Sequence, residues 1–430
     1  MKKLSFLFLI ILLLSSVAHS QWVNQGAFPD ENLKGQLHGI AVDPDGKIWV
    51  ANFGTEAFVV PGDTTNITTR LIRVFNPDGT HASFSPIWSI TVAGVTDTLF
   101  GSNSRGMRAD HNGNILYVDG AQNMWRINYL TGEGMNKVAL ALGTSPTSPA
   151  VDGEGNIYVA PVVNANNPIK IFSSDFSEIG IVDTIKMSGF SRTVEVSQDG
   201  LTLYLPIYDK KYIKVYNRPD EFSNWDSVGT IMNGAACEAL AWNKATGELW
   251  FSGGSYNPGD LPDTLSSFTP NTYYAYNFTT NSVTDSLHWS FTIPENPAER
   301  PRGIDFSPDG RTAYIGCFAG SGYPLVQKVI NTGVGISYES DVVNGFELVQ
   351  NYPNPFNPST EIKFSVINSG MTSLKVYDVL GREVAVLVNE NLNSGQYIFT
   401  FNGSNLASGT YVYELVSNGT RVAKKMLLMK

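Results

Sequence analysis

His38-Gly39-Ile40-Ala41-Val42-Asp43-Pro44-Asp45-Gly46-Lys47-Ile48-Trp49-Val50 is a segment of three parts. A short apolar run comes first, a turn rich in aspartate and ending in glycine follows, and a second run contains Ile, Trp and Val. Aspartate starts such a turn by bonding to its own backbone, and glycine accepts the positive φ that closes a tight hairpin. The segment therefore predicts a β-hairpin.

The same pattern returns five times further along the chain. The six turn glycines are Gly46, Gly113, Gly155, Gly200, Gly247 and Gly310. Three of their separations are 42, 45 and 47 residues, the length of one four-stranded propeller blade, and the other two are 67 and 63. The two long intervals need insertions of about twenty residues each. A third, half-exposed strand with alternating apolar residues follows most copies, as at Ile169–Ser173 and Ile213–Asn217.

This repeat resembles that of NHL and YVTN-type six-bladed β-propellers. The resemblance extends over residues from about 30 to 335. A β-sandwich or a β-helix with coincidental spacing is the alternative. We expect an all-β chain, with a six-bladed β-propeller at residues 21–335 followed by a small immunoglobulin-like β-sandwich.

One position can be compared in all six copies, because it lies eight residues before the turn glycine, or nine in the fifth copy. It is occupied by His38, Arg105, Thr147, Arg192, Glu238 and Arg302. If the first strand of each copy is innermost, this ring lies near one mouth of the central channel. Arginine bonds carboxylate and sulfate through two donors at once, so the ring predicts a site for an anionic group of a glycan or peptide. The alternative is that Glu238 pairs with an arginine and the others are solvated rim residues.

An enzyme is the alternative function. Propellers that resemble gluconolactonases hold a divalent metal in the channel, and such a metal would make this protein a hydrolase or lactonase. Glu195 and Asp305 lie three residues beyond the ring, and the odd offset predicts that they face away from it. A hard cation needs several oxygens at one point, so we expect no metal and no cofactor. No Gly-x-Ser-x-Gly, HExxH or CxxC motif occurs. We therefore favour a binding protein over an enzyme, with a purely structural role on the cell surface as a third reading.

The chain has two cysteines, Cys237 and Cys317. Cys237 precedes the ring position of the fifth copy, and Cys317 follows the turn of the sixth, so neighbouring blades could bring them to one mouth. A disulfide requires Cα atoms within about 7 Å. A disulfide and two buried thiols both remain open.

Three motifs mark the last part of the chain, which follows a small, polar linker at 336–345. They are Asn351-Tyr352-Pro353-Asn354-Pro355-Phe356-Asn357-Pro358-Ser359-Thr360, Val376-Tyr377-Asp378-Val379-Leu380-Gly381-Arg382 and Leu406-Ala407-Ser408-Gly409-Thr410-Tyr411-Val412-Tyr413, and the chain ends in Lys424-Lys425-Met426-Leu427-Leu428-Met429-Lys430. Residues 346–430 resemble the type A C-terminal sorting domain of the type IX secretion system. The resemblance implies that an outer-membrane translocon recognises this domain and that the protein is delivered to the cell surface or the medium.

About seven short alternating strands in this region predict an immunoglobulin-like β-sandwich. The prolines of the first motif cannot extend a ladder, so we expect that segment to be rigid but not a strand. The sorting residues that we infer from the resemblance are Lys424, Lys425 and Lys430, with Gly381 and Gly409 holding turns. An adhesion or carbohydrate-binding sandwich without a sorting role is the alternative.

The first 20 residues predict a signal peptide. Lys2 and Lys3 precede the apolar run Leu4–Leu14, and Ala18-His19-Ser20 supplies small residues for cleavage before Gln21. No later segment is long and apolar enough to cross a membrane. The formal charge of −10, without clustered Lys or Arg, argues against a nucleic acid partner. The sequence thus predicts a protein exported through the periplasm to the outer surface or the medium.

Overall fold

The computed structural model describes residues 22–30, 32–33, 35–62, 66–99, 101–163, 167–182, 189–278, 281–291, 299–318, 324–331, 336–340, 345–368, 370–392, 394–403 and 406–430. The predicted signal peptide at 1–20 lies outside the described residues. The described chain forms two compact units, residues 22–331 and residues 332–430, and each is treated by itself.

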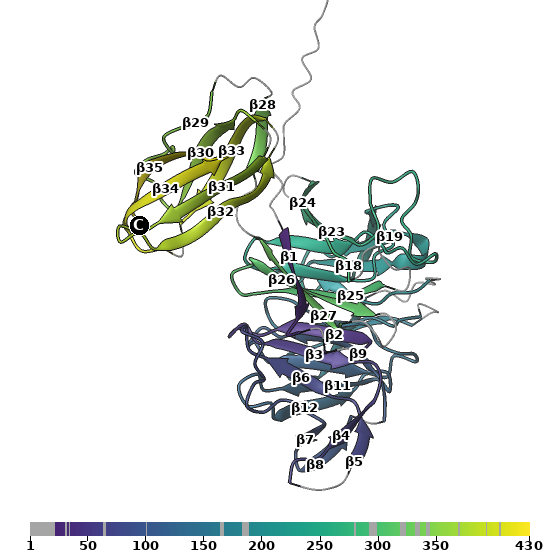
Figure 1. The fold of residues 1–430 in the computed structure, drawn as a ribbon. Coiled ribbons are helices and arrows are strands. Elements are labelled where there is room, and N and C mark those ends of the chain that lie inside the picture. Colours follow the sequence, from purple (N-terminus) through teal and green to yellow (C-terminus); the bar gives the residue numbers. More distant parts are fainter. Residues whose placement is uncertain are drawn as a thin grey trace, which may run out of the picture. The chain divides into compact units, whose positions relative to one another are not determined.

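Six sheets of three or four strands form the blades of a β-propeller in the described part of the first unit (Figure 1). From the inside outwards, blade 1 contains β2 (Leu37–Val42), β3 (Ile48–Asn52) and β6 (Ile72–Phe75). Blade 2 contains β9 (Ser104–Ala109), β10 (Ile115–Asp119), β11 (Asn123–Ile127) and β12 (Gly134–Ala139). Blade 3 contains β13 (Ala150–Val151), β14 (Ile157–Val159), β15 (Ile169–Phe172) and β16 (Glu178–Val182). The first long interval between turn glycines contains two additional hairpins, β4 (Glu56–Val59) with β5 (Asn66–Thr69) and β7 (Ser89–Val92) with β8 (Val95–Thr98).

Blades 4 to 6 follow the same plan. Blade 4 contains β17 (Glu195–Val196), β18 (Thr202–Ile207), β19 (Tyr212–Asn217) and β20 (Asp226–Ile231). Blade 5 contains β21 (Leu240–Asn243), β22 (Glu248–Ser252), β23 (Thr272–Asn277) and β24 (Ser282–His288). Blade 6 contains β25 (Arg300–Phe306), β26 (Thr312–Phe318), β27 (Val326–Asn331) and β1 (Trp22–Phe28). A single 3-10 turn, η1 (Tyr208–Lys210), follows β18.

The inner strands close into a ring. Each contacts the inner strand of the next blade, and β25 contacts β2. The chain closes the ring a second time, because β1 pairs antiparallel with β27, with Trp22 opposite Asn331 and Phe28 opposite Val326. The sequence analysis did not predict that β1 would complete the last blade. Joining the two ends of the unit in one sheet leaves no gap in the circle of blades.

Aspartate organises the hairpin turns as the sequence predicts. In blade 1, Asp43 Oδ1 accepts the backbone N–H groups of Asp45 and Lys47 at 3.0 and 2.9 Å, and Oδ2 accepts the indole N–H of Trp49 at 2.9 Å. Gly46 closes the turn with φ +79°. The same carboxylate therefore fixes the turn and the packing of the second strand.

Glycines allow the inner strands to converge around the channel. A Cβ atom on Gly106 would lie 2.4 Å from the Cα of Ser148 in the next blade, and one on Gly303 would lie 2.7 Å from Cγ2 of Ile40. The ladders of blades 1, 2 and 6 also contain β-bulges here, and Arg105 and Arg302 are the unpaired residues. A bulge resets the alternation of side chains along a strand, which changes which residues face the channel.

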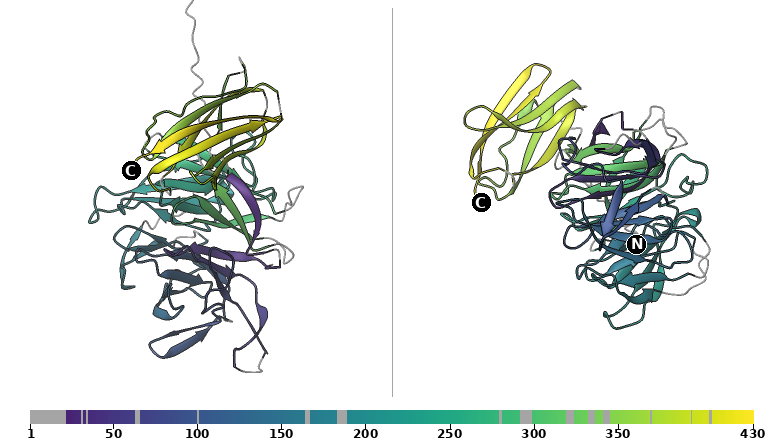
Figure 2. Two further views of the ribbon diagram at one scale, coloured as in Figure 1. Left: turned by 60° about the vertical axis from the view of Figure 1, so that its left-hand side comes forward. Right: turned by 90° about the horizontal axis from the view of Figure 1, so that it is seen from below.

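The second unit is a β-sandwich of two four-stranded sheets (Figure 2). Their strands, in spatial order, are β28 (Ile336–Ser340), β33 (Gly395–Asn402), β30 (Ser359–Val366), β29 (Glu347–Leu348); and β32 (Glu383–Leu392), β31 (Gly370–Tyr377), β34 (Gly409–Ser417), β35 (Thr420–Leu428). Inward-facing aromatic and aliphatic side chains from both sheets form one core, which includes Phe364, Leu374 and Tyr413.

The linker prediction at 336–345 was wrong for its first half. Ile336–Ser340 is strand β28, which pairs with β33 through Ile336 opposite Phe399. The short alternating run is surrounded by small polar residues, and its partner lies about 60 residues further on, so local composition concealed it. Residues 332–335 and 341–344 lie outside the described residues.

Two further local expectations were only partly right. Gly381 has φ +78° and closes a turn, whereas Gly409 is the first residue of β34 and is not among the glycines with positive φ. The proline-rich segment is not a strand, yet Phe356 forms a parallel bridge to Leu428 at the edge of β35. Its N–H donates to the carbonyl of Leu427 at 2.9 Å, and its carbonyl accepts from Met429 at 3.0 Å.

Candidate ligand-binding site in the propeller channel

Five of the six predicted ring residues meet at one mouth of the channel, which we call the ring mouth. His38, Arg105, Arg192, Glu238 and Arg302 line a small cavity of about 20 Å³. Thr147 does not join them, because it is fully buried and its hydroxyl accepts the N–H of Ala160 at 3.1 Å. Its neighbour Ser148 lines the cavity instead.

Glu238 is held by two arginines. Arg302 donates from Nη1 to Oε2 of Glu238, and Nε of Arg192 lies 3.7 Å from the same oxygen. Burial raises the pKa of Glu238 to about 6, while Arg302 opposes this shift and Asp260 adds to it. The pairing agrees with the first half of the alternative interpretation. Of the ring residues outside this pair, His38 and Thr147 are buried, and Arg105 and Arg192 are half-buried.

The remaining ring residues leave positive charge uncompensated. His38 is 5% exposed, and burial, together with Arg302, Arg105 and Arg192, holds its pKa well below the ordinary value, so it is neutral at pH 7. Among the described residues, Arg105 has no carboxylate within ion-pair distance, and its buried Nε has no hydrogen-bond partner. The ring mouth therefore contains three guanidinium groups and one carboxylate, and only Arg192 and Arg302 lie within ion-pair distance of it.

Each ring arginine lies over an aromatic side chain. The guanidinium carbon of Arg105 is 5.5 Å from the centre of the Phe53 ring, that of Arg192 is 5.3 Å from Tyr208, and that of Arg302 is 5.1 Å from Phe318. Such stacking holds a guanidinium in place. Nη2 of Arg192 also donates to the hydroxyl of Tyr208 at 3.2 Å. These aromatic residues were not among the predicted site residues. The available signal was that all three stand at the end of the second strand of their copy.

The channel is crossed below the ring by a second ion pair. Arg108 of blade 2 donates to the carboxylate of Glu195 in blade 4, and also to the carbonyl of Leu240 in blade 5 at 3.0 Å. Burial raises the pKa of Glu195 to about 7, against the effect of Arg108. Arg108 lines both the small cavity and a larger one on the far side, so the pair separates the two.

The expectation that Glu195 and Asp305 face away from the channel was wrong, because both line the larger cavity. In blade 6 the bulge at Arg302 shifts the alternation of side chains by one residue, so Asp305 faces the channel. In blade 4 the inner strand is only two residues long, so regular alternation does not extend from Arg192 to Glu195. Within the described residues, no group of three or more His, Cys, Asp or Glu side chains is placed to hold a metal ion.

Cys237 and Cys317 are free thiols in the structure, and both are fully buried. Of the two alternatives for these residues, the structure thus has the buried thiols. Burial raises the pKa of Cys237 to about 12, so this sulfur is neutral at physiological pH.

In the C-terminal unit, one tyrosine joins the first and third motifs. The hydroxyl of Tyr413 donates to the carbonyl of Val349 at 2.9 Å and accepts the N–H of Asn351 at 2.8 Å. The side chain of Asn351 in turn donates to Thr360 Oγ1 at 2.9 Å. The proline-rich segment is thereby fixed against β34, and Gln350 donates to the carbonyl of Lys425 on β35 at 2.8 Å.

The predicted sorting lysines lie on and after the edge strand β35. Lys425 is exposed, Lys424 is half-buried opposite Tyr413, and the backbone N–H of the exposed Lys430 donates to Ser408 Oγ at 3.0 Å. Residues 350–429 match the family described as secretion system C-terminal sorting domain. The chain carries a type IX sorting domain. The protein is accordingly exported through the type IX (Por) system to the outer surface or the medium.

The unit that precedes the sorting domain is similar in fold to solved propellers. A streptogramin B lyase is 13% identical, with 73% of this chain and 98% of that chain covered and a TM-score of 0.46. Virginiamycin B lyase from Staphylococcus aureus is 15% identical over 72% and 99%, with a TM-score of 0.44. The WD40 β-propeller domain of Doa1 is 11% identical over 72% and 97%, with a TM-score of 0.43. No curated protein matches the chain, and no described helix is long and apolar enough to span a membrane.

Proposed function

We propose that the propeller is the binding module of this exported protein, and that its ring mouth holds an anionic group. A carboxylate or sulfate on a glycan or peptide is the class of group that fits. The observation that carries the proposal is Arg105, a half-buried guanidinium without a carboxylate partner among the described residues, beside Arg192 and Arg302. A planar guanidinium presents paired donors that match two oxygens of one anion.

The size of the ring mouth defines what can enter. A cavity of about 20 Å³ has room only for a small terminal group, so the rest of the ligand would lie outside it. Phe53, Tyr208 and Phe318 surround the arginines and are half-buried, so each offers a ring face or edge to that part. We therefore propose that the ring mouth recognises the charged end of a glycan or peptide chain, and that this end enters the cavity.

A hydrolase or lactonase with a divalent metal in the channel is the second candidate. Glu238 would be its first ligand, but this carboxylate already accepts from Arg302 and lies near Arg192. A cation there would have to displace a guanidinium, and it would meet three positive groups. The electrostatics of the ring mouth thus favour an anion over a cation.

The experiment is calorimetric titration of the full chain with sulfate, glucuronate and a divalent cation. We expect saturable binding of at least one anion, weakened at least tenfold by Arg105→Ala. Lys137→Ala removes the same charge from the outer strand β12, where Lys137 pairs with Asp97, and is the matched control. Anion binding that survives Arg105→Ala and Arg192→Ala together would refute the proposal. Calcium, magnesium or zinc binding that is lost in Glu238→Gln would establish the metal site instead.

A further inference from the structure

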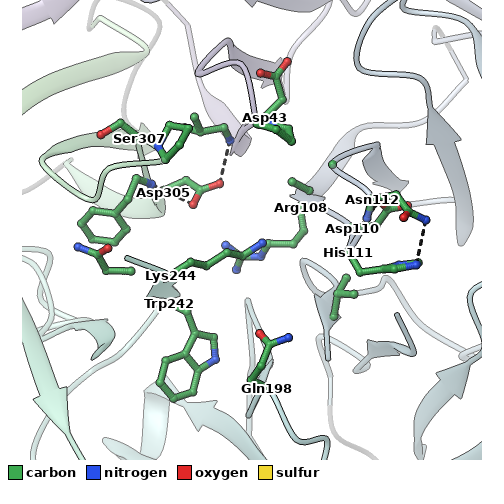
Figure 3. A pocket seen from close by; sticks show the side chains of 18 of the residues that line it. Asp43, Arg108, Asp110, His111, Asn112, Gln198, Trp242, Lys244, Asp305 and Ser307 are labelled. Atoms are coloured by element: carbon green, nitrogen blue, oxygen red, sulfur yellow. Dashed lines mark hydrogen bonds between the residues drawn. The ribbon is translucent and has the colours of Figure 1, made fainter. Parts of the chain in front are cut away.

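The opposite mouth of the channel contains a larger cavity, which we call the turn mouth because the hairpin turns of several blades surround it. Its volume is about 780 Å³, within the range of roughly 300–1,000 Å³ that is usual for small-molecule sites. All six blades contribute to its walls, through residues such as Val42, Arg108, Val151, Gln198, Lys244 and Asp305. Figure 3 shows Arg108, Lys244, Asp305 and Gln198 pointing into this space from different blades.

The charges around the turn mouth balance. Asp110 pairs with Arg126 at 2.6 Å, Glu195 pairs with Arg108, and Asp43 is used by its own turn. Besides His111, this leaves one acidic group, Asp305, and one basic group, Lys244, to face the cavity. A site of balanced charge does not select an anion or a cation, in contrast with the ring mouth.

Several polar groups at the turn mouth are available to a ligand. Lys244 and Gln198 are exposed, and no side-chain hydrogen bond commits either of them within the described chain. Arg108 is 8% exposed, and its buried Nε lacks a partner. These donors, and the remaining lone pairs of Asp305, suit hydroxyl groups, which donate and accept at once.

The backbone at the turn mouth does not offer a place for an extended peptide. The N–H of Val42 on the inner edge of blade 1 donates to Asp305 at 2.8 Å, and the carbonyl of Leu240 accepts from Arg108. A peptide that adds a strand needs such groups unpaired. An acyl chain would cover the Arg108–Glu195 pair with hydrocarbon, at a cost in desolvation.

The walls supply apolar surface next to these polar groups. Trp242 is half-buried and donates its indole N–H to the carbonyl of Val196 at 2.8 Å, so its ring is fixed in the wall. Tyr129 and Phe306 add further aromatic surface. A sugar ring has an apolar face of C–H groups and a rim of hydroxyl groups, which matches both kinds of lining.

We propose that the turn mouth is a second binding site, for an uncharged oligosaccharide of two or three sugar units. The proposal does not depend on the ring mouth, because the Arg108–Glu195 pair lies between the two cavities. The protein would then have two sites of different chemistry on one channel axis, one for an anionic group and one for neutral sugar.

The test is titration of the full chain with maltotriose, cellotriose, xylotriose and triacetylchitotriose. We expect saturable binding of at least one of them, weakened at least tenfold in the double variant Gln198→Ala/Lys244→Ala. Both side chains are exposed and make no side-chain hydrogen bond within the described chain. Circular dichroism checks that the double variant is folded. Lys137→Ala is the control for loss of a positive charge, and Arg105→Ala is the control for the ring mouth. Neither should change binding of the neutral sugar.

Three results would overturn the proposal. One is the absence of saturable binding by all four trisaccharides. Another is binding that the double variant retains in full. The third is neutral-sugar binding that Arg105→Ala abolishes, since that would place the sugar at the ring mouth. Because sulfate binding is measured on the same variants, failure of one site is distinguishable from failure of the other.

Discussion

Arg302 and Glu238 form an ion pair across the boundary between blades 6 and 5, and their side chains are only 3% and 1% exposed. Arg192 of blade 4 approaches the same carboxylate. One acidic side chain therefore links the inner strands of three consecutive blades at the ring mouth. Removal of either partner would leave the other charge buried and unpaired. The cost of that unpaired charge exceeds the stabilisation that the intact pair provides.

We expect Glu238→Ala to lower the free energy of unfolding by about 3–5 kcal/mol, since Arg302 stays buried without its main partner. Arg302→Ala should cost a similar amount. The double variant should cost clearly less than both single variants together, because it removes both charges. Chemical denaturation of the three variants measures this coupling. Strict additivity would show that the two groups do not interact.

The affinity of the ring mouth for sulfate should depend on pH in a defined direction. Above its pKa of about 6, Glu238 is ionised and cancels one of three guanidinium charges, and below that pKa it is neutral. Burial and the neighbouring arginines hold the pKa of His38 well below its ordinary value, so His38 adds no positive charge at pH 7. Sulfate should therefore bind about tenfold tighter at pH 5 than at pH 7, a difference of about 1.4 kcal/mol.

Glu238→Gln is the variant that assigns this effect. It keeps the shape of the side chain and removes the titrating charge, so it should bind sulfate at pH 7 as tightly as the parent does at pH 5, with no dependence on pH between them. A pH dependence that persists in Glu238→Gln would assign it to another group.

The stability of the propeller should respond to Glu195 in a separate pH window. Burial raises the pKa of this carboxyl from 4.5 to about 7. Between these values the folded state binds more protons than the unfolded state, so this contribution to stability falls as the pH rises from about 4.5 to about 7. Relative to Glu195→Gln, the parent should lose thermal stability over that range and change no further above it. Melting temperatures of both proteins from pH 4.5 to 8 test this expectation.

The sequence was sufficient for the repeat, the hairpin turns and the assembly of most of the ring, because these depend on local spacing and turn chemistry. It was not sufficient for Glu195 and Asp305, whose direction depends on bulges and a short strand that appear only when neighbouring blades meet. Thr147 does not join the ring for a similar reason, since its hydroxyl accepts the N–H of Ala160, the residue after β14. Strands β1 and β28 pair with residues that lie far along the chain, so the local sequence pattern does not reveal their partners.

Gly106 tests the close approach of the inner strands. A Cβ atom there would lie 2.4 Å from the backbone of Ser148, so blades 2 and 3 would have to separate. We expect Gly106→Ala to lower the free energy of unfolding by about 2–3 kcal/mol, because overpacking and the strain of an L residue at φ +159° act together. Gly54→Ala is the control, because no atom lies within 4 Å of its added Cβ and its φ is not positive. Equal effects of the two substitutions would show that the close approach is not limiting.

The lysines of the sorting domain should matter for export and not for stability. Lys425 on β35 is exposed, and its side chain makes no hydrogen bond or ion pair within the described residues, so its charge is available to a partner. We expect Lys425→Glu to reduce the fraction of protein outside the cell at least fivefold, with an unchanged melting temperature. Lys363→Glu, on strand β30 of the other sheet, makes the same charge change and should leave export intact. Normal export of Lys425→Glu would remove this lysine from the recognition surface, and equal loss in both proteins would point to net charge in place of a local contact.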